Sequence, residues 1–403
     1  MIRISCACLS CFCLLSLASF VEAADWRQFR GSDNSSVVTD GQTPSELAEN
    51  AVAWSAELPG KGPSSPIVVS NRVVVTSAGG RNQDRMHVMA FDVQNGQELW
   101  RREFWATGRT LTHPSSGNAA PTPASDGERI YAFFSSNDLV CLDLDGNLQW
   151  YRGLASDYPK AGNDVGMSSS PVVIGDTVIV QVENQGDSFA AGLDARTGKN
   201  RWRIERERVA NWASPLVLHS PDKQPVVLLQ NGHGVAAHDP VTGKELWRHE
   251  ASCDAITSPA TDGQVVVMAS EGLSAIKVPQ SGGSPEALWS SNKLSTGASS
   301  PIVHDGKVYT VNRAGVLNCG NLTDGEVTWK LRLGIGRQWA TPAVAGDLMY
   351  CFDSDGKAAV VRLADEPEVV ATAEFDEGFQ ASPAVANGAV YIRTDKRLLK
   401  FAM

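Results

Sequence analysis

The residues best suited to binding chemistry lie in two long segments and just before later prolines. Residues 101–120 carry Trp105, Arg109 and His113, and residues 151–169 carry Asp157, Tyr158, Lys160 and Asp164. The positions shortly before later prolines hold Asn211, Trp212, Arg337, Gln338, Trp339 and Gln380. Aromatic and arginine side chains anchor interfaces, and loops on a rigid scaffold carry binding residues disproportionately. As a set these residues predict a binding site, although each one singly is also typical of a solvated loop or a packing aromatic.

Catalytic signatures are missing from the sequence. It contains no HExxH, no phosphate-binding P-loop and no GxSxG. The histidines show no metal-ligand spacing: His87, His113, His219, His233, His238, His249 and His304. Beyond residue 23 only four cysteines remain, far apart at Cys141, Cys253, Cys319 and Cys351, and buried free thiols are favoured over disulfides. We therefore predict no catalytic residue and no metal site.

The elements that would position these residues repeat along the chain. Ser or Thr precedes proline at Pro66, Pro123, Pro171, Pro215, Pro259, Pro301, Pro342 and Pro383, with gaps of 57, 48, 44, 44, 42, 41 and 41 residues. Periods of about 40 to 50 residues are typical of propellers and arrays. The long segments are the insertions in the first units.

Each unit follows the same order of parts. Proline opens a short apolar run, a Gly, Asp or Asn turn follows, two more β-rich runs come next, and an Asp-to-Gly-to-Trp hairpin ends the unit. Residues 193–202 (LDARTGKNRW) and 238–247 (HDPVTGKELW) show the ending most clearly. Asp starts such a turn and Gly supplies its left-handed residue. Four antiparallel strands per unit make one propeller blade, so the fold class predicted is an all-β, eight-bladed propeller.

The tryptophan of each ending is expected to pack between neighbouring blades. Seven units have one: Trp54, Trp100, Trp150, Trp202, Trp247, Trp289 and Trp329. The unit that starts at Pro342 has residues 371–373 (ATA) at the matching place, so its junction is expected to be the loosest.

The last unit predicts how the ring closes. About three strands remain after Pro383, while Trp54 precedes the first proline. We expect the strand around residues 51–58 to complete the last blade, because pairing of N- and C-terminal strands removes a free edge. A seven-bladed ring with one unit detached is the alternative. The expected divisions are a signal peptide at 1–23, an N-terminal extension at 24–50 and the propeller at 51–403.

The N-terminus and the charge bear on location and partners. Arg3, an apolar run over 11–20 and Ala23 are typical of a cleaved export signal, which predicts a periplasmic or secreted protein. No second apolar stretch is long enough to span a membrane, so contact with one would be peripheral. The formal charge of -10 argues against nucleic acid as a partner.

The repeats resemble the pyrroloquinoline-quinone (PQQ)-type propeller repeat, A-x-D-x-x-T-G-x-x-x-W, best at residues 191–202 and 237–247. That family has a dehydrogenase branch and a non-catalytic branch that includes the B component of the β-barrel assembly machinery. The opening stretch DWRQFRG, residues 25–31, resembles the start of secreted polyvinyl-alcohol-dehydrogenase-like propellers. Fold resemblance alone does not establish activity.

The resemblance to the dehydrogenase branch implies a quinone between a tryptophan floor and a disulfide of adjacent cysteines, with Ca²⁺ and a catalytic Asp nearby. Trp212 or Trp339 would be the floor, but no two cysteines beyond residue 23 are adjacent. We therefore favour an exported, monomeric, non-catalytic scaffold without a cofactor, which binds a protein, peptide or small ligand at the channel mouth. The alternatives are a PQQ- and calcium-dependent alcohol dehydrogenase and a purely structural envelope protein.

Overall fold

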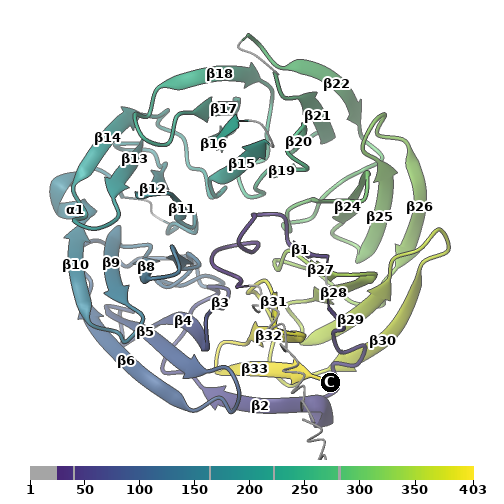
Figure 1. The fold of residues 1–403 in the computed structure, drawn as a ribbon, viewed down its shortest axis with the longest axis horizontal. Coiled ribbons are helices and arrows are strands. Elements are labelled where there is room, and N and C mark those ends of the chain that lie inside the picture. Colours follow the sequence, from purple (N-terminus) through teal and green to yellow (C-terminus); the bar gives the residue numbers. More distant parts are fainter. Residues whose placement is uncertain (1–24, 40, 163–164, 221–222, 280–282) are drawn as a thin grey trace, which may run out of the picture.

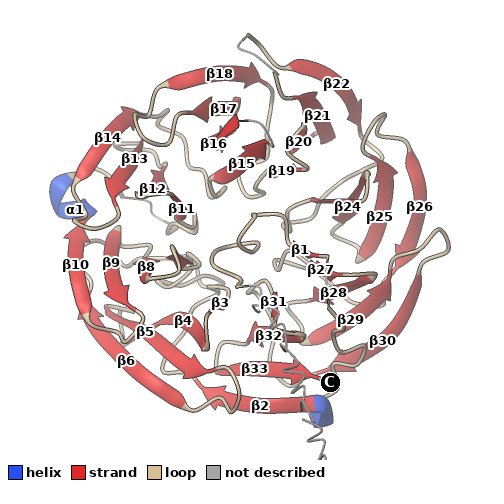
Figure 2. Cartoon of the chain, viewed as in Figure 1, coloured by secondary structure: helices blue, strands red, loops and turns tan. Residues whose placement is uncertain are grey.

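The computed structural model describes residues 25–403 except 40, 163–164, 221–222 and 280–282. Eight four-stranded antiparallel blades surround a central channel (Figures 1 and 2). The prediction of an all-β, eight-bladed propeller is therefore confirmed. The predicted signal peptide lies outside the described residues.

The first four blades follow the chain in order. Blade 1 consists of β3 (Ile67–Val69), β4 (Arg72–Gly79), β5 (Arg85–Asp92) and β6 (Glu98–Trp105). Blade 2 consists of β7 (Ala124–Ser125), β8 (Arg129–Phe133), β9 (Asp138–Asp143) and β10 (Leu148–Gly153). Blade 3 consists of β11 (Val172–Ile174), β12 (Thr177–Val182), β13 (Phe189–Asp194) and β14 (Asn200–Glu205). Blade 4 consists of β15 (Leu216–Ser220), β16 (Lys223–Asn231), β17 (Gly234–His238) and β18 (Glu245–Glu250).

The remaining four blades complete the ring. Blade 5 consists of β19 (Ala260–Thr261), β20 (Val265–Ser270), β21 (Gly272–Lys277) and β22 (Glu286–Ser291). Blade 6 consists of β23 (Ile302–His304), β24 (Lys307–Val311), β25 (Val316–Asn321) and β26 (Val327–Arg332). Blade 7 consists of β27 (Ala343–Ala345), β28 (Leu348–Phe352), β29 (Lys357–Arg362) and β30 (Glu368–Glu374). Blade 8 consists of β31 (Ala384–Ala386), β32 (Ala389–Arg393), β33 (Arg397–Ala402) and β2 (Val52–Glu57).

Three short elements lie outside this pattern. They are β1 (Val37–Val38), the 3-10 helix η1 (Glu49–Ala51) and the helix α1 (Leu154–Asp157). β1 pairs in parallel with β27, the innermost strand of blade 7. Among the described residues, no helix is long and apolar enough to cross a membrane.

The indoles lie at the seams between blades and explain the repeated Gly-to-Trp spacing. Each docked indole donates its Nε1–H to a carbonyl of the next blade; the pairs are Trp54–Val93, Trp100–Leu144, Trp150–Ala195, Trp202–Pro240 and Trp289–Leu322. The turn glycine of the next blade lies directly against the ring. At Gly243, φ is +73°, and an added Cβ would lie 2.6 Å from the Trp202 indole. This position therefore requires glycine for its backbone conformation and for the space it leaves.

The seams of Trp247 and Trp329 differ from the other five. Trp247 packs with Val266 and Met268 of blade 5. The Trp329 indole nitrogen is buried and has no hydrogen-bond partner. The turn that follows in blade 7, residues 363–367 (LADEP), lacks the Asp-to-Gly pattern of the other units.

The N- and C-terminal strands close the ring as predicted. β2 pairs antiparallel with β33, and Trp54 faces Lys400 in the register. The Trp54 indole then docks on blade 1 through Val93, so blade 8 joins blade 1 by the same seam as the other blades.

The junction between blades 7 and 8, where no tryptophan is present, is covered by the N-terminal extension. Ala371 pairs with Val360 at the position that tryptophan takes elsewhere. Leu47 of the extension is buried in the cluster that both blades form. The Tyr350 hydroxyl donates to the Pro44 carbonyl at 2.8 Å. The extension therefore supplies apolar packing at the junction that the sequence predicts to be the loosest.

Candidate functional site

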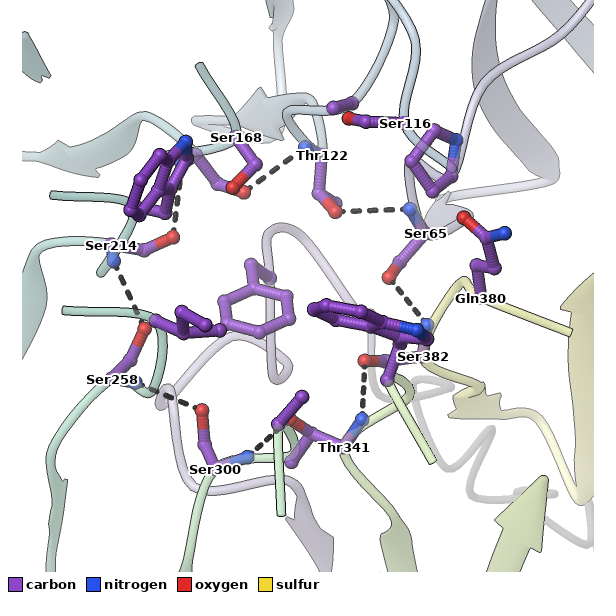
Figure 3. A pocket seen from close by; sticks show the side chains of 18 of the residues that line it. Ser65, Ser116, Thr122, Ser168, Ser214, Ser258, Ser300, Thr341, Gln380 and Ser382 are labelled. Carbon is purple, nitrogen blue, oxygen red and sulfur yellow. Dashed lines mark hydrogen bonds between the residues drawn. The ribbon is translucent and has the colours of Figure 1, made fainter. Parts of the chain in front are cut away.

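The inner ends of all eight blades carry one hydroxyl side chain each, at the residue before the proline. These residues are Ser65, Thr122, Ser170, Ser214, Ser258, Ser300, Thr341 and Ser382. The backbone N–H of each donates to the hydroxyl oxygen of the next, at 2.9 to 3.1 Å, until the circle closes from Ser382 to Ser65. Figure 3 shows this circle of hydrogen bonds around the pocket. We call these eight residues the hydroxyl ring.

Local sequence explains why the ring forms. A residue before proline is biased towards extended backbone, and proline has no N–H to give to a ladder. The last free N–H of each connection therefore points along the circle, where the next hydroxyl accepts it. In the sequence, Ser or Thr before every proline marks the repeat but does not by itself place the hydroxyls side by side. A hydroxyl in all eight units was the signal that could have revealed the ring.

Above the ring lies a cavity of about 630 Å³, a size typical of ligand pockets. All eight ring residues line it. Its other polar and large apolar lining residues include Phe29, His113, Trp212, Ile256, Arg337, Trp339 and Gln380.

Two tryptophans in the wall are held in place by neighbouring groups. The Trp212 indole donates its Nε1–H to the Gly166 carbonyl at 2.8 Å. The Arg337 guanidinium lies 4.6 Å from the centre of the Trp339 ring, which is a cation–π contact. The two long loops are also joined, because the His113 backbone N–H donates to the Val165 carbonyl at 3.0 Å. The wall is therefore built from several connected loops.

The floor of the cavity is the N-terminal extension, which enters the channel and contacts the blades in turn. Trp26 exchanges two backbone hydrogen bonds with Val68 of blade 1, and the Arg27 carbonyl accepts the Ser125 N–H of blade 2. The Gln28 side-chain oxygen accepts the Val173 N–H of blade 3.

The contacts continue around the channel. The Asn34 side-chain oxygen accepts the Val217 N–H of blade 4. Arg30 donates to the carbonyls of Pro259 and Pro301, in blades 5 and 6, at 2.6 and 2.9 Å. The Ser36 carbonyl accepts the Val344 N–H of blade 7. Residues 25–38, which we call the plug, thus bind seven blades and close one end of the channel.

The cavity is positively biased. Its lining contains no Asp or Glu, although the chain has 45 acidic and 35 basic residues. Arg30 is 2% exposed, and burial lowers its pKa to about 10, so it stays protonated at neutral pH. Among the described residues, its hydrogen-bond partners are carbonyl and hydroxyl oxygens, with no carboxylate among them. The floor therefore holds a buried positive charge that the described residues do not neutralise.

The structure brings five of the residues singled out from sequence to the cavity and leaves others outside it. His113, Trp212, Arg337, Trp339 and Gln380 line the cavity. The residues of the long loops that do not line it are Trp105, Arg109, Asp157, Tyr158 and Lys160. Asp164 lies outside the described residues.

The excluded loop residues have other contacts. Trp105 is 61% exposed and lies under the Arg85 guanidinium, 5.5 Å away. Asp157 pairs with Arg152. Tyr158 packs against Phe189, with ring centres 4.5 Å apart. These side chains therefore lie outside the cavity. The sequence alone could not predict which residues of the long segments would reach it.

Asn211 and Gln338 are buried beside the wall. The Asn211 amide donates to the Gln230 carbonyl at 3.0 Å, close to Glu183. Burial raises the pKa of Glu183, and its carboxylate is paired with Arg206. Gln338 is 2% exposed, and neither of its side-chain polar atoms has a hydrogen-bond partner. Asn211 directly precedes Trp212, so its contacts can fix the position of that indole.

The fold and the site define the class of protein as a propeller of PQQ-type repeats with a cavity closed at one end. The family model described as "Outer membrane protein assembly factor BamB" matches residues 29–227 and 230–366, more than half of the chain. The chain therefore belongs to this family.

The similar proteins include a dehydrogenase and an assembly factor. The chain is 23% identical over 374 residues to a polyvinylalcohol dehydrogenase of a Pseudomonas species, covering 81% of this chain and 52% of the relative. It is 27% identical over 244 residues to the outer membrane protein assembly factor BamB of Burkholderia pseudomallei (strain K96243), covering 56% of this chain and 57% of the relative. The chain thus spans about half the length of these relatives.

Solved structures show the same fold. BamB from Moraxella catarrhalis superimposes with a TM-score of 0.63 at 18% identity, covering 87% of this chain and 96% of that one. The quinohemoprotein alcohol dehydrogenase from Comamonas testosteroni gives a TM-score of 0.68 at 14% identity, covering 94% of this chain and 80% of that one. At these identities the likeness establishes the fold alone.

Proposed function

We propose that this protein is an exported, non-catalytic scaffold that binds a partner in the cell envelope at the mouth of its channel. The observation that carries the proposal is the cavity above the hydroxyl ring, closed below by the plug. A channel with a closed end can receive a ligand or a protruding segment, but it gives no passage through the ring.

The rim around this cavity supports a protein as the partner. Two apolar side chains that line the cavity, Val165 and Ile256, are each 39% exposed. Leu111 and Val209 are also exposed, on the loops that connect blades 1 and 2 and blades 3 and 4. Apolar groups gathered at the edge of a concave site are typical of interaction surfaces. Membership of the BamB family supports an envelope partner, and the sequence pattern of residues 1–23 supports export.

A PQQ- and calcium-dependent dehydrogenase is the second candidate, favoured by the relative named polyvinylalcohol dehydrogenase. The residues fit this cofactor poorly. Among the residues that the structure describes, no three His, Cys, Asp or Glu side chains form a group that could hold a metal ion. The cavity lining has no carboxylate for a catalytic base and no cysteine for the expected lid. Glu183 lies near Asn211 but is already paired with Arg206.

Site-specific photo-crosslinking in the producing cells tests the scaffold proposal. A photoreactive residue at Trp339 or Ile256 should crosslink one and the same envelope protein. The matched control is Leu246, which is 45% exposed on the outer strand β18, away from the mouth. Equal crosslinking from Leu246, or none from either mouth position, contradicts the proposal.

A second measurement tests whether the tryptophans that line the cavity contribute to the affinity for the partner. With the crosslinked partner in hand, Trp212→Ala with Trp339→Ala should weaken its binding at least about tenfold, because buried aromatic anchors carry much of an interface energy. The melting temperature of the double variant shows whether its fold is kept. A folded double variant that binds normally places the interface elsewhere.

A further inference from the structure

We propose that the hydroxyl ring is an oxyanion site, and that the cavity takes a carboxylate or phosphate group attached to a flat apolar body. This inference deepens the proposed function, because it assigns a ligand class to the same cavity. It stands on the hydrogen bonds, the charges and the shape of the cavity.

The ring leaves eight hydroxyl protons for a ligand. Each hydroxyl oxygen accepts one N–H, and none of the eight hydroxyls donates to a protein acceptor within the described residues. The ring side chains line the cavity but belong to residues that are only 2 to 7% exposed. Ionised carboxylates and phosphates only accept hydrogen bonds, so they match a circle of donors. The N–H that each hydroxyl accepts polarises its O–H and makes it a better donor.

Two buried guanidinium groups lie beside the ring. Arg30 donates to the carbonyls of Pro259 and Pro301, which directly follow the ring residues Ser258 and Ser300. Arg393 is fully buried and donates to Ser64, next to the ring residue Ser65. Its Nη2 has no hydrogen-bond partner. Burial lowers the pKa of Arg393 to about 10, so both arginines carry their charge at neutral pH.

Arg30 has no carboxylate partner among the described residues, and Arg393 has only the Coulombic attraction of Asp395. Neither buried arginine forms an ion pair with a carboxylate in the described part of the chain, and neither does Arg337 at the rim. A buried cation without a counter-charge is costly. An anion at the ring would offset that cost, whereas an ammonium or amidinium group would add to it.

The walls suit an apolar body. Trp212, Trp339 and Ile256 line the cavity and offer flat or apolar contact above the ring, and Phe29 of the plug offers apolar contact from the floor. An anionic group at the ring would place the rest of the ligand against these side chains. The ligand class is therefore an oxyanion with a flat apolar remainder.

Four probes of nearly equal shape test the proposal with the full mature chain. Benzoate and phenyl phosphate carry the two oxyanions, benzamide is neutral, and benzamidine is cationic. Tryptophan fluorescence and titration calorimetry at low ionic strength should show that at least one oxyanion binds about tenfold more tightly than benzamide, because charge-assisted hydrogen bonds are stronger than neutral ones. Benzamidine should bind least. Benzoate or phenyl phosphate binding alone identifies which oxyanion the ring prefers.

Two pairs of variants locate the binding. Arg337→Gln should weaken the preferred oxyanion several-fold and leave benzamide unchanged, whereas Arg332→Gln, an exposed arginine of β26 in the same blade, should do neither. Ser258→Ala should weaken oxyanion binding, whereas Ser258→Thr keeps the hydroxyl and should retain it. If Ser258→Ala fails to fold, the probe series and the Arg337 pair still decide.

The proposal is overturned if neither oxyanion binds more tightly than benzamide, or if Arg337→Gln and Arg332→Gln behave alike. These outcomes are separate from the crosslinking result. Specific crosslinks from Trp339 without oxyanion binding would contradict the proposed ligand class and support the proposed protein-binding scaffold. Oxyanion binding without crosslinks would leave a small-ligand site and remove the protein partner.

Discussion

At the scale of single residues, each seam combines one indole with one glycine. The Trp202 indole donates to Pro240 and lies against Gly243, whose φ of +73° already favours glycine. The spacing in the sequence predicted the turn and the indole. It could not predict that the two meet across a seam, because the partner glycine belongs to the next unit, 41 residues further along the chain.

Gly243→Ala should therefore destabilise the protein more than an ordinary turn substitution. We expect a loss of about 2 to 4 kcal/mol, from a side chain at positive φ and from overpacking against Trp202. Gly346→Ala is the matched control, since its φ is +58° but nothing lies within 4 Å of the added Cβ. Urea unfolding should give the control a loss of only about 1 to 2 kcal/mol. Equal losses of unfolding free energy in the two variants would show that the Trp202 indole moves aside for the added methyl group without cost.

The four described cysteines are free thiols, of which Cys141, Cys319 and Cys351 are buried and Cys253 is partly buried. Burial raises the pKa of Cys141 and Cys351 to about 12 and that of Cys253 to about 11. Because the thiolate is the reactive form, a chromogenic disulfide reagent at pH 8 should label the native mature chain slowly. All four thiols should react at once in guanidinium chloride. Rapid labelling of the native chain would contradict this prediction.

At the scale of elements, the blades were largely predictable and the loops were not. Proline and the turns recur in every unit, and tryptophan in all but the unit that starts at Pro342, so the strands could be predicted from the local pattern. The closure by β2 could be predicted because only about three strands remain after Pro383. Which loop residues line the cavity depends on the path of each connection between blades, and the sequence does not determine that path. Trp212 and Trp339 each stand three residues before a proline and reach the cavity, whereas Trp105 ends an outer strand and does not line the cavity.

The junction between blades 7 and 8 yields a prediction for the extension. Leu47 is 2% exposed in a cluster with residues of both blades, where no tryptophan fills the seam. Leu47→Ala should therefore lower the free energy of unfolding by about 2 to 4 kcal/mol. Leu246→Ala, at an exposed outer position, should change it by no more than about 0.5 kcal/mol. A small effect at Leu47 would show that the blades pack without the extension.

At the scale of the whole molecule, neither the plug nor the hydroxyl ring could be predicted from the sequence, for one physical reason. Both are made by contacts across a closed circle, such as that between Arg30 and the Pro301 carbonyl, 271 residues apart. Local periodicity contains no information about which segment fills a channel. The stretch DWRQFRG was noticed for its resemblance, and its role as the floor appears only once the blades surround it.

Removing residues 25–38 should open the channel and loosen the inner strands. The amides of Val173, Val217 and Val344 donate to plug residues, so they should exchange with deuterium much faster in the deletion variant. Amides of the outer strands β14 and β18 serve as the internal control. Unchanged exchange at the three valines would mean that other groups protect them.

The plug also constrains the order in which this chain can complete its fold during synthesis. Residues 25–57 leave the ribosome early, yet Arg30 bonds to Pro301, Ser36 bonds to Val344 and β2 pairs with β33. The plug and β2 must therefore wait for strands made much later, and a chain halted before Arg397 would leave β2 without its partner strand and the ring open.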